Sequence, residues 1–150
     1  MSSTPPIEAN SGRRHIFAYG SLMYPAVWSR IVRGEYRSRS ATIHGFRRVC
    51  VRGHEHPALV IAPRAEALSG VLYYDVGPDD VARLDHFETA NYARVLVAAT
   101  VEGAAIAASA YLALNVEDLL DQEWDAARFE HTGLAKFLTS YAVANCPPAR

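Results

Sequence analysis

The sequence has little cysteine and no long apolar run. Its two cysteines, Cys50 and Cys146, lie far apart and outside any metal-type spacing, so the sequence predicts reduced thiols rather than a disulfide framework. No segment reaches the roughly 18 continuous apolar residues that a membrane span requires, and the first residues lack the apolar core of a signal peptide. These absences predict a cytoplasmic protein that does not contact membranes.

The chain also lacks an excess of charge of either sign. Fifteen basic and sixteen acidic residues give a formal net charge of −1, without a run of like charges. A nucleic acid or an acidic membrane surface requires a basic patch, which this pattern does not provide. We therefore expect a small-molecule partner, and the composition carries no signal for an oligomeric state.

The length and composition favour a single domain. The chain has 150 residues, of which 50% are hydrophobic, enough for one buried core. Residues 1–13 are rich in Ser, Pro and Asn and predict a disordered leader. Residues 146–150 include two prolines that cannot continue a helix, so we expect a loose tail after a domain over residues 14–145.

The order of hydrophobic patterns predicts an α+β fold. Strands are expected in the segments HIFAYG, ATIHGFRRVCVRG, PALVIAP and SGVLYYDV, and a hairpin of two more in YARVLVAATVEGAAIAASAYLAL. Helices are expected from Pro25 to Gly34, from Pro78 through LDHFE, and over EWDAARFEHTGLAKFLTSYAVAN with a possible break at Gly133. Six strands without regular β-α-β alternation indicate a small mixed sheet or barrel.

Glu88 occupies an unusual position on the predicted second helix. At about 100° per residue from Val81, Glu88 falls near 340°, close to Leu84 and toward the apolar interior. Burial of a carboxylate raises its pKa, which suits a group that transfers protons. Alternatively, the helix ends at Phe87 and leaves Glu88 as an exposed cap or ion-pair partner; Asp85, near 40°, is the weaker candidate and is expected to be solvated.

Four segments together resemble the γ-glutamylcyclotransferase superfamily, in particular its branch related to plant avirulence-induced proteins. They are FAYGSL at the first strand, LDHFE, YARVLV and EWDAARFE, and the resemblance covers about residues 15–141. It implies a small mixed six-stranded β-barrel with flanking helices. The chain departs from the family at one position. The resemblance implies that Glu88 is the catalytic glutamate, and relatives often have Gly directly after it, whereas this chain has Thr89. The resemblance therefore does not define the path of the loop after Glu88.

The resemblance implies roles for two of these segments. Glu88 matches the catalytic glutamate of the family, and Tyr19, Gly20, Ser21 and Leu22 match its substrate-binding turn, which Met23 and Tyr24 continue. The implied reaction is intramolecular aminolysis of a small γ-glutamyl compound, which releases 5-oxoproline and an amine or amino acid and needs no cofactor. Backbone N–H groups of the turn would bind a substrate carboxylate or the developing oxyanion. Ser21 lacks the sequence context of a nucleophile.

Two further residues are candidates for substrate binding. Tyr92 and Arg94 share one face of a predicted strand, and Arg94 either binds a substrate carboxylate or pairs with Glu88. Tyr73, Tyr74 and Tyr111 are expected in the core or sheet, although one hydroxyl could line the pocket.

Two other functions stay open. A domain of the same fold could bind a small ligand without turnover. In a less favoured alternative, His54 and His56 face the same way on a strand and share a metal ion, but a third ligand at plausible spacing is missing, so no metal site is predicted.

Overall fold

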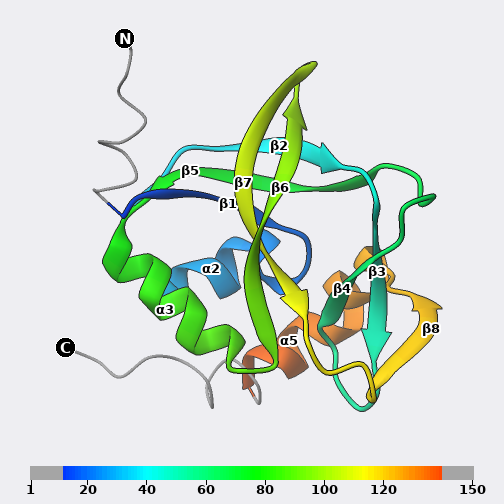
Figure 1. The fold of residues 1–150 in the computed structure, drawn as a ribbon. Helices are drawn as coiled ribbons and strands as arrows, with labels where there is room; N and C mark the ends of the chain where they lie inside the picture. The colour runs from blue at the N-terminus through cyan, green and yellow to red at the C-terminus, as the bar shows by residue number, and fades with distance from the viewer. Residues whose placement is uncertain (1–11, 140–150) are drawn as a thin grey trace, which may run out of the picture.

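Five strands form a closed barrel in the computed structural model, which describes residues 12–139 (Figure 1). In spatial order they are β1 (Arg14–Ala18), β5 (Leu68–Val76), β2 (Ser38–Ile43), β6 (Tyr92–Val101) and β7 (Ala104–Ala113). Neighbouring strands are antiparallel except at the closure, where β1 and β7 run parallel and Ile16 pairs with Ser109. The sequence-predicted hairpin of β6 and β7 is confirmed, and its turn residues Glu102 and Gly103 both have positive φ, as a two-residue type I′ turn requires.

Three more strands form a separate sheet in the order β4 (Pro57–Ile61), β3 (Phe46–Val51), β8 (Leu119–Glu123). The predicted α+β class is correct, but the predicted six-stranded barrel is corrected to a five-stranded barrel beside this sheet. The extended segment expected over residues 41–53 divides at Gly45, whose φ of +88° turns the chain from β2 into β3. Strand β8 has no clear hydrophobic alternation; it forms because it pairs with β3, where Val49 lies opposite Glu123.

The helices pack around one side of the barrel. A single 3₁₀ turn, η1 (Ser21–Met23), follows β1, and helices α2 (Pro25–Ile31) and α3 (Pro78–Glu88) lie side by side (Figure 1). Helix α2 ends before the predicted Gly34, because Val32 is extended. The third predicted helix begins at α4 (Ala126–Arg128) and continues through the π-helical turn η2 (Phe129–Gly133) into α5 (Leu134–Phe137), so Gly133 does not break it.

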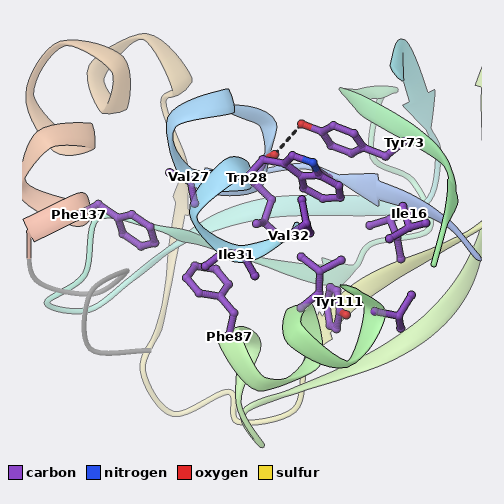
Figure 2. Packing of buried hydrophobic residues seen from close by; sticks show 14 of the residues in the cluster. Ile16, Val27, Trp28, Ile31, Val32, Tyr73, Phe87, Tyr111 and Phe137 are labelled. Atoms are coloured by element: carbon purple, nitrogen blue, oxygen red, sulfur yellow. Dashed lines mark hydrogen bonds between the residues drawn. The ribbon is translucent and has the colours of Figure 1, made fainter. Parts of the chain in front are cut away.

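Strand β1 contributes to two hydrophobic clusters because its side chains alternate between its faces. Phe17 points into the barrel, whereas Ile16 and Ala18 pack toward the helices. In the helix-side cluster, the Trp28 ring stacks on Tyr73 with 3.6 Å between ring centroids, and Phe87 lies near Phe137 (Figure 2). The Tyr73 hydroxyl also donates a 2.9 Å hydrogen bond to the carbonyl oxygen of Leu22, drawn as a dashed line in Figure 2. The turn after β1 is thereby fixed to β5.

The buried carboxylate of Asp80 fixes the start of α3. It accepts hydrogen bonds from the N–H groups of Arg33 and Gly34 at 2.9 Å and from the Tyr36 hydroxyl at 2.6 Å, and it pairs with Arg83 at 2.7 Å. Burial by itself would raise the pKa of Asp80, but these hydrogen bonds outweigh it and lower the pKa. The segment after α2 is therefore held against α3, the helix that ends at Glu88.

Several sequence-based predictions lie outside the described residues. Residues 1–11 of the predicted leader and the whole of the predicted tail, 146–150, are among them, as is Cys146. The single domain over residues 14–145 stays a prediction. Within residues 12–139, no helix has both the length and the apolar character needed to cross a membrane.

Candidate active site

The end of β1 and the end of α3 meet at one pocket. Gly20, Ser21 and Leu22 contribute to its wall from the turn after β1, and Glu88, the last residue of α3, contributes from the other element. The complete lining is Phe17, Ala18, Tyr19, Gly20, Ser21, Leu22, His56, Pro57, Phe87, Glu88 and Tyr111. Its free volume is about 20 Å³, room for about one water molecule. The residues around Glu88 therefore leave only a narrow space with a mixed polar and apolar wall.

The turn after β1 lines this pocket and has backbone N–H groups that are not used in hydrogen bonds among the described residues. Ser21 and Leu22 open the 3₁₀ turn η1, and the first N–H groups of any helical turn lack partners within it. The described residues provide no hydrogen-bond acceptor for the N–H groups of Gly20, Ser21 and Leu22. Three adjacent N–H groups of this kind can bind an anion or a polarised carbonyl oxygen.

Position 20 favours glycine because the opposite wall is close. A Cβ atom built on Gly20 would lie 2.6 Å from Cγ and 2.7 Å from Cδ of Pro57, well inside van der Waals contact. Pro57 is the first residue of β4, whose side chains are buried at this point. The glycine thus lets the backbone approach the second sheet and keeps the pocket open between them.

The carboxyl group of Glu88 is in surroundings poor in water. Although the residue keeps part of its surface exposed, burial and, after it, the negative charge of Asp85 raise the pKa of Glu88 from 4.5 to about 8. A carboxyl group with this pKa is protonated about as readily as an α-amine, so it can exchange a proton with an amine at low cost. Helix α3 includes Glu88 as its last residue, so the alternative in which the helix ends at Phe87 is wrong.

Asp85, whose charge acts on Glu88, is itself held in an ion pair. Its Oδ1 accepts hydrogen bonds from Nε of Arg94 at 2.8 Å and from the Tyr111 hydroxyl at 2.7 Å. Arg94 therefore pairs with Asp85, and within residues 12–139 it forms no ion pair with Glu88. The side chain of Asp85 is 41% exposed, as expected of a solvated residue, but it is also held by these two hydrogen bonds. Burial and the hydrogen bond to Asp85 raise the pKa of Tyr111, so its hydroxyl keeps its proton.

Four of the predicted substrate-binding residues line other hollows. Tyr92 and Arg94 line a polar hollow of about 420 Å³, whose wall also includes Asp85 and Tyr111. Tyr111 lines this hollow and the Glu88 pocket. Their role in substrate binding stays a prediction.

Met23 and Tyr24 lie on a third hollow. Its wall includes Arg48 and Glu130, and the Tyr24 hydroxyl donates a 3.1 Å hydrogen bond to Glu130. The predicted cradle is thus divided: Tyr19 to Leu22 line the pocket that contains Glu88, whereas Met23 and Tyr24 do not. Whether they contact substrate stays a prediction.

His56 and Pro57 line the Glu88 pocket, although sequence reasoning considered His56 only as a metal ligand. Burial and the neighbouring His54 lower the pKa of His56 to about 4, so its imidazole is neutral. The two imidazole rings are 4.9 Å apart. Within residues 12–139, no group of three or more His, Cys, Asp or Glu side chains is arranged to hold a metal ion. The run PALVI after His56 is a buried strand, which was the available signal that His56 enters the core.

Comparison with known proteins identifies the family. The family model described as "Gamma-glutamyl cyclotransferase, AIG2-like" matches residues 16–126. The chain belongs to this family. AIG2-like protein D of Arabidopsis thaliana is 32% identical over 79 residues, which span 53% of this chain and 51% of that protein. AIG2-like protein A of the same plant is 27% identical over 130 residues, or 85% of this chain and 78% of that one.

Solved structures share the fold of this AIG2-like γ-glutamyl cyclotransferase family member. The solution structure of an Arabidopsis thaliana protein has a TM-score of 0.67 at 25% identity, covering 87% of this chain and 89% of the other. A structure of a gamma-glutamyl cyclotransferase has a TM-score of 0.60 at 17% identity, covering 92% and 90% of the two chains. The resemblance in the sequence is thus confirmed for family and fold. The chain spans about half the length of AIG2-like protein D.

Proposed function

We propose that this protein is a γ-glutamylcyclotransferase that acts on a small γ-glutamyl compound, with Glu88 as general acid and base. The observation that supports the proposal is that Glu88 lines one pocket together with Gly20, Ser21 and Leu22, whose N–H groups have no acceptor among the described residues. A reaction of this type needs a proton acceptor near the attacking amine and hydrogen-bond donors near the attacked carbonyl. Family membership adds support, because the family is named for this activity.

The raised pKa of Glu88 suits the first step. The α-amine of a γ-glutamyl group is protonated at neutral pH, with a pKa near 8, and must lose a proton before it can attack. An ordinary carboxylate would take that proton at a cost of about 5 kcal/mol. With a pKa of about 8 for Glu88, the transfer costs almost nothing. The amine is then neutral and Glu88 is protonated.

In the second step the neutral α-amine attacks the γ-carbonyl carbon and a C–N bond forms. The carbonyl oxygen becomes an oxyanion, which the N–H groups of the turn stabilise. Glu88 gives its proton to the leaving nitrogen and takes one from the new ring nitrogen as the original C–N bond breaks. The products are 5-oxoproline and an amine, and the proton left on Glu88 passes to that amine or to water. No step requires a cofactor.

The test is release of 5-oxoproline from a panel of γ-glutamyl compounds, in which the leaving group is an amino acid, a lysine ε-amine or a simple amine. We expect release from at least one of them by the wild-type protein, and loss of release in Glu88→Gln. A matched control is Glu117→Gln, which changes an exposed glutamate and should retain the activity. Binding without release would instead support a ligand-binding module, and activity that depends on added metal would contradict the proposed mechanism.

The cytoplasmic location predicted by the sequence belongs to the same proposal. Small γ-glutamyl compounds are polar, and an enzyme that acts on them needs only an aqueous compartment. Fractionation of cells that express the protein would test it, with recovery in the membrane fraction as the contradicting result.

A further inference from the structure

The side chain of Arg48 contacts the backbone just before the turn, and it lines a different hollow from Glu88. Its Nη1 donates a 2.9 Å hydrogen bond to the carbonyl oxygen of Tyr19 and a longer one, 3.4 Å, to that of Ser69. Its guanidinium carbon lies 5.1 Å from the centre of the Trp124 ring. The first of these contacts places a cation at the carbonyl oxygen of the peptide group that joins Tyr19 to Gly20, and the other two hold the cation there.

Arg48 differs from its neighbour Arg47, although both belong to β3. Arg47 pairs with Asp121 at 2.9 Å and with Glu123 at 2.6 Å on the exposed side of the sheet. Among residues 12–139, no carboxylate lies within ion-pair distance of Arg48, and its recorded hydrogen bonds go to backbone carbonyl oxygens. Successive side chains of a strand point to opposite faces, which is why adjacent arginines have such different partners.

The geometry of the peptide group relates Arg48 to the pocket. In a planar trans peptide the C=O and N–H bonds point in opposite directions. The carbonyl oxygen of Tyr19 points to Arg48, so the N–H of Gly20 points away from Arg48. Gly20 lines the Glu88 pocket, whereas Arg48 lines the hollow with Met23 and Tyr24. The hydrogen bond from Arg48 therefore holds the carbonyl end of the same peptide group whose N–H belongs to Gly20.

We propose that Arg48 is a positioning residue of the proposed cyclotransferase: by binding the Tyr19 carbonyl it directs the Gly20 N–H into the pocket and strengthens it as a donor to the oxyanion. This inference rests on the proposed function. A charged donor on the carbonyl draws electron density from the peptide, which makes the N–H of the same peptide a better donor. Arg48 itself does not touch the reacting atoms.

The electrostatic environment is consistent with this role. Burial lowers the pKa of Arg48, yet an arginine keeps its charge in a protein, so the turn faces a permanent cation. Burial of a cation is costly, and the contacts with carbonyl oxygens, the Trp124 ring and the charge of Glu123 offset this cost.

The kinetic test compares three variants: Arg48→Met, Arg48→Lys and the control Arg47→Met. We expect Arg48→Met to lower kcat for 5-oxoproline release about 10- to 100-fold with a smaller change in KM, because the missing interaction acts on the transition state. Lysine keeps a charged donor, so Arg48→Lys should recover part of the loss. Arg47→Met should retain wild-type kcat.

A second readout does not depend on turnover. In ¹⁵N-labelled protein, the Gly20 amide proton resonance should move upfield in Arg48→Met, move less in Arg48→Lys, and stay in place in Arg47→Met. If the wild-type protein releases no 5-oxoproline, the proposed function fails, and this resonance still decides whether Arg48 acts on the turn. An unchanged Gly20 resonance in both Arg48 variants, or wild-type kcat in Arg48→Met, would overturn the inference. If Arg48→Met does not fold, the comparison of Arg48→Lys with Arg47→Met decides it.

Discussion

The Tyr111 hydroxyl donates a 2.7 Å hydrogen bond to Oδ1 of Asp85, and this contact connects strand β7 to the last turns of helix α3. The backbone of Tyr111 serves the other half of the site, since its carbonyl oxygen accepts a 2.6 Å hydrogen bond from the Tyr19 hydroxyl. One residue of the barrel therefore holds both the turn after β1 and the helix that carries Glu88. A substitution at Asp85 should therefore change the pKa of Glu88.

Replacement of Asp85 by Asn should shift the pH dependence of activity. The groups around Glu88 are Asp85 on its own helix, Tyr111 and Arg94 from the hairpin, and neutral His56 before β4. Loss of the negative charge of Asp85 leaves Arg94 as a net positive neighbour, and both effects lower the pKa of Glu88. Because the base must be ionised, the rising limb of the kcat/KM profile should move to lower pH, on the order of one unit. A limb that stays in place would contradict the coupling.

The replacement of Glu88 by Gln should stabilise the protein at alkaline pH. The pKa of Glu88 rises from 4.5 to about 8 on folding. The stability contributed by this group is thus fully present below about pH 4.5 and is lost as the pH rises through 8. Glutamine stays neutral, so we expect Glu88→Gln to gain on the order of 1–3 kcal/mol relative to wild type between pH 5 and pH 9. Urea denaturation at both pH values measures this gain, and equal stability differences at the two would contradict it.

Thr89 is strained. Its φ is +67°, a conformation that a β-branched residue rarely adopts, and it follows Glu88 directly. Thr89→Gly should therefore raise the free energy of unfolding by about 1 kcal/mol, whereas Thr89→Ala, which keeps a Cβ atom, should change it less. Chemical denaturation of the three proteins provides the comparison. The interpretation would be wrong if the glycine variant were less stable than the alanine variant.

Asp80 should control stability in acid. Its pKa is lowered in the folded protein, so its contribution is present above the unfolded value near 3.9 and is lost as the pH falls through the folded pKa. Asp80→Asn weakens a network that includes Arg83 and should cost about 3 kcal/mol at neutral pH, with a smaller difference near pH 3. Thermal unfolding at the two pH values checks this. Asp79→Asn is the matched control, because Asp79 is exposed beside it.

Gly20→Ala should impair the pocket more than the fold. The added methyl group would lie 2.6 Å from Cγ of Pro57, so the turn or β4 must shift, at a cost of about 1–3 kcal/mol. We expect this variant to lose most 5-oxoproline release while its circular dichroism stays that of a folded protein. Gly103→Ala is the control: it is strained at a φ of +86° but meets no atom within 4 Å, so it should lose stability and retain activity. Equal activity in the two variants would contradict the role of the narrow turn.

Local patterns in the sequence were sufficient for most of the elements and for one side of the candidate site. The 3.6-residue period placed Glu88 on the inner face of its helix. Asp85, whose charge raises the pKa of Glu88, lies only three residues earlier in the same helix. The strand-like run that ends at Gly20 likewise located the turn, and the sequence VEGA located the hairpin. Such features depend on residues a few positions apart, so a single chain segment contains them.

Contacts between distant segments were decided only by the tertiary structure. Strand β8 and the closure of β7 on β1 arise from pairing across the chain, and neither leaves a local pattern. The same holds for Arg48 at the Tyr19 carbonyl and for His56 in the pocket wall. The sequence by itself therefore singled out the residues that we propose as the general base and the N–H donors. The side chains that surround these residues, orient them and shift their pKa values come from elements far apart in the chain. The packing of such elements cannot be read from residue spacing.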